Sequence, residues 1–146
     1  DGLFMREIGS IQSVKAVEIG DGVAASGEFG SAVHDEIYNS KHGYSRKTNR
    51  AGGIEGGMSN GEDIVIHAYI KPIPTLKNGL NTVDISNGKA AVAASERSDV
   101  CAVPAAGVVC EAAAAIALCT ALSEMLGGDT MQEVVERYGK KVGCHE

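Results

Sequence analysis

The order of hydrophobic and polar residues divides the chain into a strand-forming first part and a helical last part. Alternation over Val14–Ile19, ended by a Gly-Asp-Gly turn, predicts a strand. The β-branched run Asp63–Lys71 predicts a second and stronger strand. The pattern further predicts a short helix that opens the chain and two short strands joined by an Asn-Gly turn: Asp1–Ser10, Leu80–Ile85 and Lys89–Ala94.

A long run of small and apolar residues then extends from about Ala105 to Leu126. Because apolar side chains surround the helix axis, the run is typical of a helix buried inside a fold. Its acidic residues Glu111 and Glu124 argue against a membrane span. A second helix is expected over Met131–Tyr138, followed by a frayed charged tail over residues 139–146. Strands followed by helices indicate an α+β fold, with antiparallel strands packed on the long Ala-rich buried helix.

Polar and glycine-rich segments separate the predicted strands. Residues 24–48 are rich in Gly, Ser and charged side chains and are expected to form a long polar loop. Within it, His34-Asp35-Glu36 resembles a ligand set, but adjacent residues rarely converge on one ion, so a solvated loop is favoured. The glycine-rich segment 49–61 suits either a hairpin turn or a loop whose backbone amides approach a ligand. His67 is interpreted as a half-buried strand histidine rather than a catalytic one.

Length, charge and cysteine spacing narrow the function classes. A chain of 146 residues forms one domain or part of a larger one. Its net charge of −6 argues against a nucleic-acid surface. The cysteines fit no zinc spacing, so no metal site is expected, and small buried thiols indicate a reducing cytoplasm: Cys101, Cys110, Cys119 and Cys144.

Candidate chemistry gathers before the long helix, where Glu96, Arg97, Ser98 and Asp99 form a polar cluster. The planar fork of Arg97 suits a phosphate or a carbonyl edge, and Asp99 can accept or donate a proton. Lys71 leads two prolines that hold the strand exit extended. From the residues, an anionic, phosphate-bearing ligand among the glycine-rich segment, Lys71 and Arg97 is the site hypothesis.

Several motifs in the same order resemble chorismate synthase. They are SIQSVKAVEIGDG from Ser10, HDEI from His34, TNRAGGIEGGMSNGEDIVIHAYIKPIPT from Thr48, and RSDVC with VP, VV and EAA from Arg97 onward. The resemblance implies a β-α-β sandwich, with helices between antiparallel sheets, assembled as a homotetramer in the cytoplasm. It also implies conversion of 5-enolpyruvylshikimate-3-phosphate to chorismate by 1,4-elimination of phosphate, in the shikimate pathway to aromatic amino acids. Reduced FMN is then the expected cofactor, with NADPH as its possible reductant.

The resemblance also implies site residues, carried over motif by motif. Asp99 matches the family aspartate near the flavin N5 and is the expected catalytic residue. The positions expected to bind the flavin are Gln12, Ser13, Gly56, Lys71, Pro72, Ile73, Pro74, Thr75 and Arg97. The Gln12-Ser13 pair departs from the usual family pattern, a change that a backbone contact tolerates.

Two family signatures have no counterpart in these 146 residues: the GESHG-like motif with its histidine and the SARET-like central motif. The chain is therefore expected to be a single-domain, C-terminal fragment of the larger family fold and to lack activity when isolated. The alternative is a non-catalytic module that shares the fold and binds a phosphate-bearing ligand or another protein. Flavin colour or fluorescence after purification would separate these readings.

Overall fold

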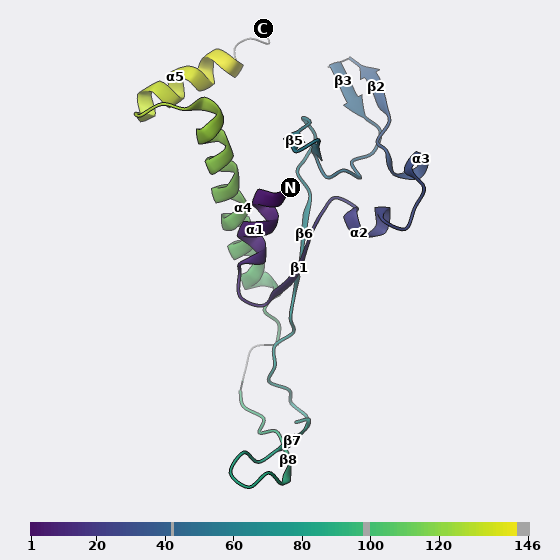
Figure 1. Ribbon diagram of the computed structural model, residues 1–146, viewed down its shortest axis with the longest axis vertical. Coiled ribbons are helices and arrows are strands. Elements are labelled where there is room, and N and C mark those ends of the chain that lie inside the picture. Colours follow the sequence, from purple (N-terminus) through teal and green to yellow (C-terminus); the bar gives the residue numbers. More distant parts are fainter. Residues whose placement is uncertain (42, 98–99, 143–146) are drawn as a thin grey trace.

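Figure 1 shows the computed structural model, which describes residues 1–41, 43–97 and 100–142. Helices and antiparallel strand pairs make an α+β fold, as the sequence predicted. The helices are α1 Gly2–Gly9, α2 Gly22–Ala25, α3 Gly30–Val33, α4 Val103–Leu126 and α5 Met131–Val142. The strands are β1 Val14–Ile19, β2 Ile37–Ser40, β3 Gly43–Arg46, β4 Ile54–Glu55, β5 Met58–Ser59, β6 Ile66–Ile70, β7 Asn81–Val83 and β8 Ala90–Val92.

The two strands predicted most strongly, β1 and β6, pair with each other and form the centre of the molecule. Their antiparallel register runs from Val14 opposite Ile70 to Ile19 opposite Ile66, with an irregularity between Val14 and Ala16. One end of this ribbon meets the glycine-rich segment, and the other end leads into the β7–β8 hairpin, which projects away from the body in Figure 1. The ribbon therefore separates the glycine-rich segment from the β7–β8 hairpin.

The main core lies where α1, β1, β4 and α4 meet. Phe4, Ile19, Ile54 and Ala117 pack together there, each at most 8% exposed. The small side chain of Ala117, which is 1% exposed, lets α4 approach α1 and the ribbon closely. The short helix predicted to open the chain is confirmed, and Phe4 and Ile8 are its buried residues.

The prediction that α4 is buried is wrong for this chain. Of its 24 residues, Ala117 and Leu126 are buried, whereas Val108 is 68% and Ile116 is 62% exposed. The apolar pattern reported the composition of the helix correctly, but α1 and β6 cover just one side of it. By length and composition α4 could also cross a membrane, a property that long core helices of soluble proteins share.

Three further expectations need correction. The thiols expected to be buried are not, since Cys101 and Cys119 are exposed and Cys110 is half-buried, while Cys144 lies outside the described residues. Residues 24–48 do not form one long loop: they continue α2, form α3, and then make the β2–β3 hairpin, in which Ile37 pairs with Arg46. The charged segment 139–142 is helical rather than frayed, because α5 continues to Val142. Thr130 caps the start of α5, since its Oγ1 atom accepts a hydrogen bond from the Glu133 amide at 3.3 Å.

Candidate functional site

One group of predicted site residues lies at the end of the ribbon where β6 stops. The Lys71 amide donates a hydrogen bond of 2.7 Å to the Ser13 carbonyl, which brings Gln12 and Ser13 beside Lys71. Ser13 has a φ of +75°, the left-handed region that non-glycine residues seldom occupy. Gln12, Ser13 and Lys71 are all exposed. The junction therefore presents a cation and a tightly turned backbone on one surface.

The segment after Lys71 leaves the ribbon without regular secondary structure, as its two prolines predict. Pro72 and Pro74 are exposed, whereas Ile73 and Thr75 are half-buried. The segment thus keeps alternate side chains toward the protein while its other face stays open to a ligand.

The second group belongs to the connection between β8 and α4. Arg97 is exposed on this connection. Asp99, the expected catalytic residue, and its neighbour Ser98 lie outside the described residues. Val103, at the start of α4, borders the same cavity as Ile70 at the end of β6, so α4 begins beside the strand exit that carries Lys71.

Gly56 lies apart from these residues. It forms the β4–β5 turn with Gly57, at the end of β6 opposite to Lys71. The φ angles of +59° and +79° identify a hairpin turn that both glycines make possible. A Cβ atom added at either position would meet no atom within 4 Å, so the turn is open on its outer side. Within this chain, Gln12, Ser13 and residues 71–75 therefore lie at one end of β6, and Gly56 lies at the other.

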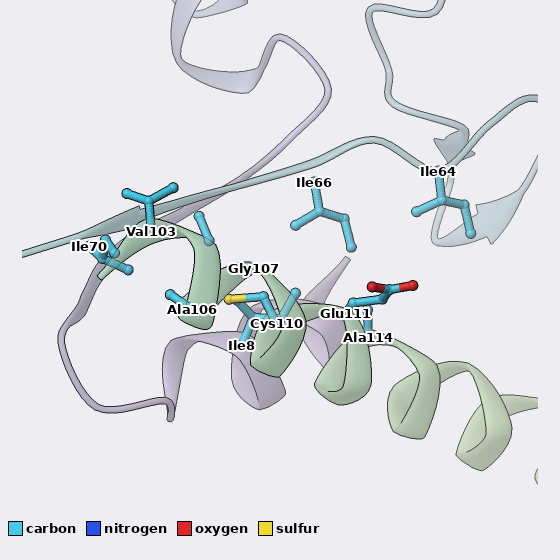
Figure 2. Close-up of a pocket in the computed structure, with 11 residues that line it drawn as sticks. Ile8, Ile64, Ile66, Ile70, Val103, Ala106, Gly107, Cys110, Glu111 and Ala114 are labelled. Atoms are coloured by element: carbon cyan, nitrogen blue, oxygen red, sulfur yellow. The ribbon is translucent and has the colours of Figure 1, made fainter. Parts of the chain in front are cut away.

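A cavity of about 400 Å³ separates β6 from α4 (Figure 2). Ile66 and Ile70 line its strand side, and Gly107 and Cys110 line its helix side. Glu111 contributes a carboxylate at one edge, and the rest of the wall is mainly apolar. This cavity suits an apolar group and offers no set of phosphate-binding cations among the residues that line it.

The opposite face of the ribbon holds a buried carboxylate that the sequence reading missed. Glu18 is 7% exposed and accepts hydrogen bonds from the Tyr69 hydroxyl and, at 2.7 Å, from the Val23 amide. The hydrogen bond from Tyr69, then that from Val23, lowers the pKa of Glu18 against the opposing effect of burial, with a smaller contribution from His67. The same bond from Tyr69 to Glu18, with burial, raises the pKa of Tyr69.

His67 completes this group, with its Nδ1 atom 3.9 Å from a Glu18 carboxylate oxygen. Its side chain is 51% exposed, in agreement with the prediction of a half-buried strand histidine. The sequence shows only that a carboxylate lies within the predicted strand Val14–Ile19; that Glu18 lies opposite His67 follows from the register, which the structure supplies. The group ties α2 to the ribbon and faces away from the cavity.

Asp35 corrects the expectation that His34-Asp35-Glu36 is simply a solvated loop. Its carboxylate accepts hydrogen bonds from the Thr48 hydroxyl and from the amides of Arg50 and Ala51, the latter two at 2.9 Å. Burial raises the pKa of Asp35, but these hydrogen bonds together outweigh it, so the pKa lies below its usual value. Asp35 therefore anchors the chain as it enters the glycine-rich segment.

The sequence profile of chorismate synthase matches residues 1–123, which include every predicted site residue. The chain belongs to the chorismate synthase family. Chorismate synthase of Caldicellulosiruptor bescii is 55% identical over 139 residues, which cover 94% of this chain and 36% of that protein. Chorismate synthases of Koribacter versatilis and Mycobacterium avium are 49% and 47% identical, each over 37% of its own length.

A solved crystal structure of chorismate synthase has the same arrangement. It superposes with a TM-score of 0.73 at 44% sequence identity, covering 98% of this chain and 35% of that protein. The chain thus spans little more than a third of the chorismate synthases that it matches. The resemblance drawn from the motifs is confirmed at the level of family and fold.

Proposed function

We propose that this chain supplies part of the active site of a chorismate synthase, a lyase of the shikimate pathway. The reaction is the anti-1,4-elimination of phosphate from 5-enolpyruvylshikimate-3-phosphate. One allylic C–O bond breaks, a proton leaves from the other end of the allyl system, and no net oxidation occurs. The observation that carries the proposal is the family match over residues 1–123, because this span holds all the residues assigned to the site.

The residues present suit a flavin mononucleotide. Lys71 and Arg97 are exposed cations that can neutralise a phosphate, and the open Gly56 turn lets a flat ring approach backbone amides. The bond from the Lys71 amide to the Ser13 carbonyl would fix the strand exit, so that residues 71–75 meet the ligand with little reordering. When bound, reduced FMN would supply electron density that assists cleavage of the allylic C–O bond.

Charge and proton handling are assigned to the chain's own side chains. Negative charge grows on the departing phosphate, and Lys71 and Arg97 are placed in the role of stabilising it. Asp99 is assigned the relay of the proton that leaves the substrate, a task for which a carboxylate within hydrogen-bond reach is suited. In a chorismate synthase that carries these residues, Asp99→Asn is expected to leave FMN affinity nearly unchanged and to slow turnover.

The chain is proposed to need further protein to complete this site. The exposed apolar side of α4 and the separation of Gly56 from Lys71 both support this idea. We assign the missing cover to the remaining part of the family fold, arranged as a cytoplasmic homotetramer that uses NADPH as reductant of the flavin. An isolated chain is then expected to form no measurable chorismate.

The test combines flavin binding with activity. The chain would be mixed with the separately produced remaining portion of the Caldicellulosiruptor bescii relative, and chorismate formation would be measured with reduced FMN. Activity in the mixture, and none in either part, is the expected result. Arg97→Ala should weaken the flavin titration, and an unaltered titration would contradict its assignment. Flavin binding by neither the chain nor the mixture would favour the non-catalytic module instead.

A further inference from the structure

Arg46 links the β2–β3 hairpin to the glycine-rich β4–β5 hairpin. Its Nη2 atom lies 2.5 Å from a carboxylate oxygen of Glu55, and its Nη1 atom donates to the Asn60 carbonyl at 3.3 Å. The Arg46 amide also donates to the Glu62 carboxylate at 2.9 Å. One residue at the end of β3 therefore holds both arms of the neighbouring hairpin.

The β4–β5 hairpin is held to the core at Ile54, which is 8% exposed, and its turn lies beyond that anchor. Each strand contributes two residues to the ladder, too few for a hairpin to be stable in water without outside contacts. The Gly56-Gly57 turn is open on its outer side, because a Cβ atom added at either glycine would meet no atom within 4 Å. Glu55 immediately precedes Gly56, so contacts that hold the Glu55 side chain act directly beside the turn.

The polar contacts around Glu55 converge on the same carboxylate oxygen. Asn60 Nδ2 donates to it at 2.8 Å, beside the Arg46 guanidinium. A second support comes from the backbone, where the Asn60 amide donates to the Gly53 carbonyl at 3.0 Å. Arg46 belongs to β3 and contacts Glu55 from outside the hairpin. Without Arg46, the contacts of this network would be those between residues of the hairpin itself.

Arg46 is kept in this position at an energetic cost. The side chain is 17% exposed, and its Nε atom is buried without a hydrogen-bond partner among the described residues. A buried donor without a partner destabilises a fold, so such a group in a native protein calls for another explanation. One explanation is that the Arg46 guanidinium is retained because it orients the Gly56-Gly57 turn.

We propose that Arg46 is a positioning residue for the flavin contact at Gly56, a role that rests on the proposed function. The guanidinium holds Glu55 and the Asn60 carbonyl together, and so fixes the direction in which the Gly56 backbone faces a ligand. A lysine cannot replace it fully, because a single ammonium lacks the planar fork that meets two acceptors.

The experiment uses the 146-residue chain and oxidised FMN as the probe. Arg46→Gln and Arg46→Lys would be compared with the wild type by amide hydrogen exchange and by NMR titration with FMN to millimolar concentration. Arg137→Gln is the matched control, because Arg137 also bonds a main-chain carbonyl, that of Leu126 at 2.9 Å, far from the glycine turn. Lys71, at the other end of β6, is an internal reference for flavin binding.

The expected result has two parts. In Arg46→Gln, exchange in β4 and β5 accelerates about tenfold or more, as loss of charge-assisted hydrogen bonds implies, while exchange in β1 and β6 is unchanged. FMN-dependent shifts at Gly56 disappear, those at Lys71 persist, Arg46→Lys lies between, and Arg137→Gln matches the wild type.

Other outcomes overturn the proposal in distinguishable ways. Shifts at Gly56 that survive in Arg46→Gln, whether or not exchange accelerates, would reduce Arg46 to a structural link. A wild type without shifts at either Gly56 or Lys71 would overturn flavin binding by this chain, and the role of Arg46 with it.

Discussion

A close backbone crossing at Gly20 provides a sharp stability prediction, the substitution Gly20→Ala. Gly20 follows β1 with a φ of +56°, and a Cβ atom there would lie 2.1 Å from the Arg50 carbonyl oxygen and 2.5 Å from the Gly52 nitrogen. These neighbours are backbone atoms that cannot swing aside. They are also held in place, since the Gly20 amide donates to Val65 at 2.9 Å and the Val65 amide donates to Gly52 at 3.2 Å.

The expected loss has two contributions. An alanine in the left-handed region costs about 1–2 kcal/mol. Forcing a methyl group into a packed backbone crossing costs about 1–3 kcal/mol more. A loss of about 2–5 kcal/mol is large beside the roughly 5–15 kcal/mol that holds a typical domain folded. We therefore expect Gly20→Ala to weaken or abolish the packing between β1 and the glycine-rich segment.

Urea denaturation followed by circular dichroism measures this effect, and Gly107→Ala is its control. Gly107 lies within α4, and an added Cβ there meets no atom within 4 Å, so alanine should stabilise the helix by about 1 kcal/mol. If Gly20→Ala unfolded at the same urea concentration as the wild type, the two backbones could not cross as closely as described, and the argument would fail.

Three other predictions follow from local contacts. Asp35→Asn should lower the free energy of unfolding by about 1 kcal/mol near neutral pH. Hydrogen bonds lower the Asp35 pKa from 3.8 despite burial. The contribution of the Asp35 carboxylate to folding stability is therefore complete above pH 3.8 and is lost as the pH falls through the lowered pKa. A difference in melting temperature between Asp35→Asn and the wild type that stayed constant down to about pH 2 would contradict this. Ser13→Gly should raise stability by up to about 1 kcal/mol by relieving the positive φ, and a lower melting temperature would show that the hydroxyl matters instead. Tyr69→Phe should raise the pKa of Glu18, measured by NMR titration of its carboxyl carbon, since the Tyr69 hydrogen bond is the main cause of its lowering.

The local sequence pattern predicted most of the regular structure. Alternation located β1 with its exact ends, the β-branched run located β6, and the Asn-Gly turn lies between β7 and β8, the two short strands that it was predicted to join. The helix expected from about Ala105 begins two residues earlier, at Val103. These elements depend on nearest neighbours and on the period of the side chains, which a sequence displays directly.

The remainder depends on partners distant in the chain. The segment 24–48 reads as a loop because its order comes from contacts such as Asp35 with Ala51, which are 16 residues apart. The apolar composition of α4 indicates that the helix is normally buried, but it does not show whether this chain contains the residues that bury it. Family motifs identified candidate site residues, yet the length of β6 between Gly56 and Lys71 separates them in a way that no motif records.

The uncovered side of α4 has a practical meaning for anyone who handles this polypeptide. A dye whose fluorescence increases in an apolar environment should bind the face of α4 that carries Val108 and Ile116, which are 68% and 62% exposed. Mild detergent micelles or a chaperone should compete for the same side chains. Loss of the dye signal would therefore give a direct titration of whatever physiological neighbour closes over the helix.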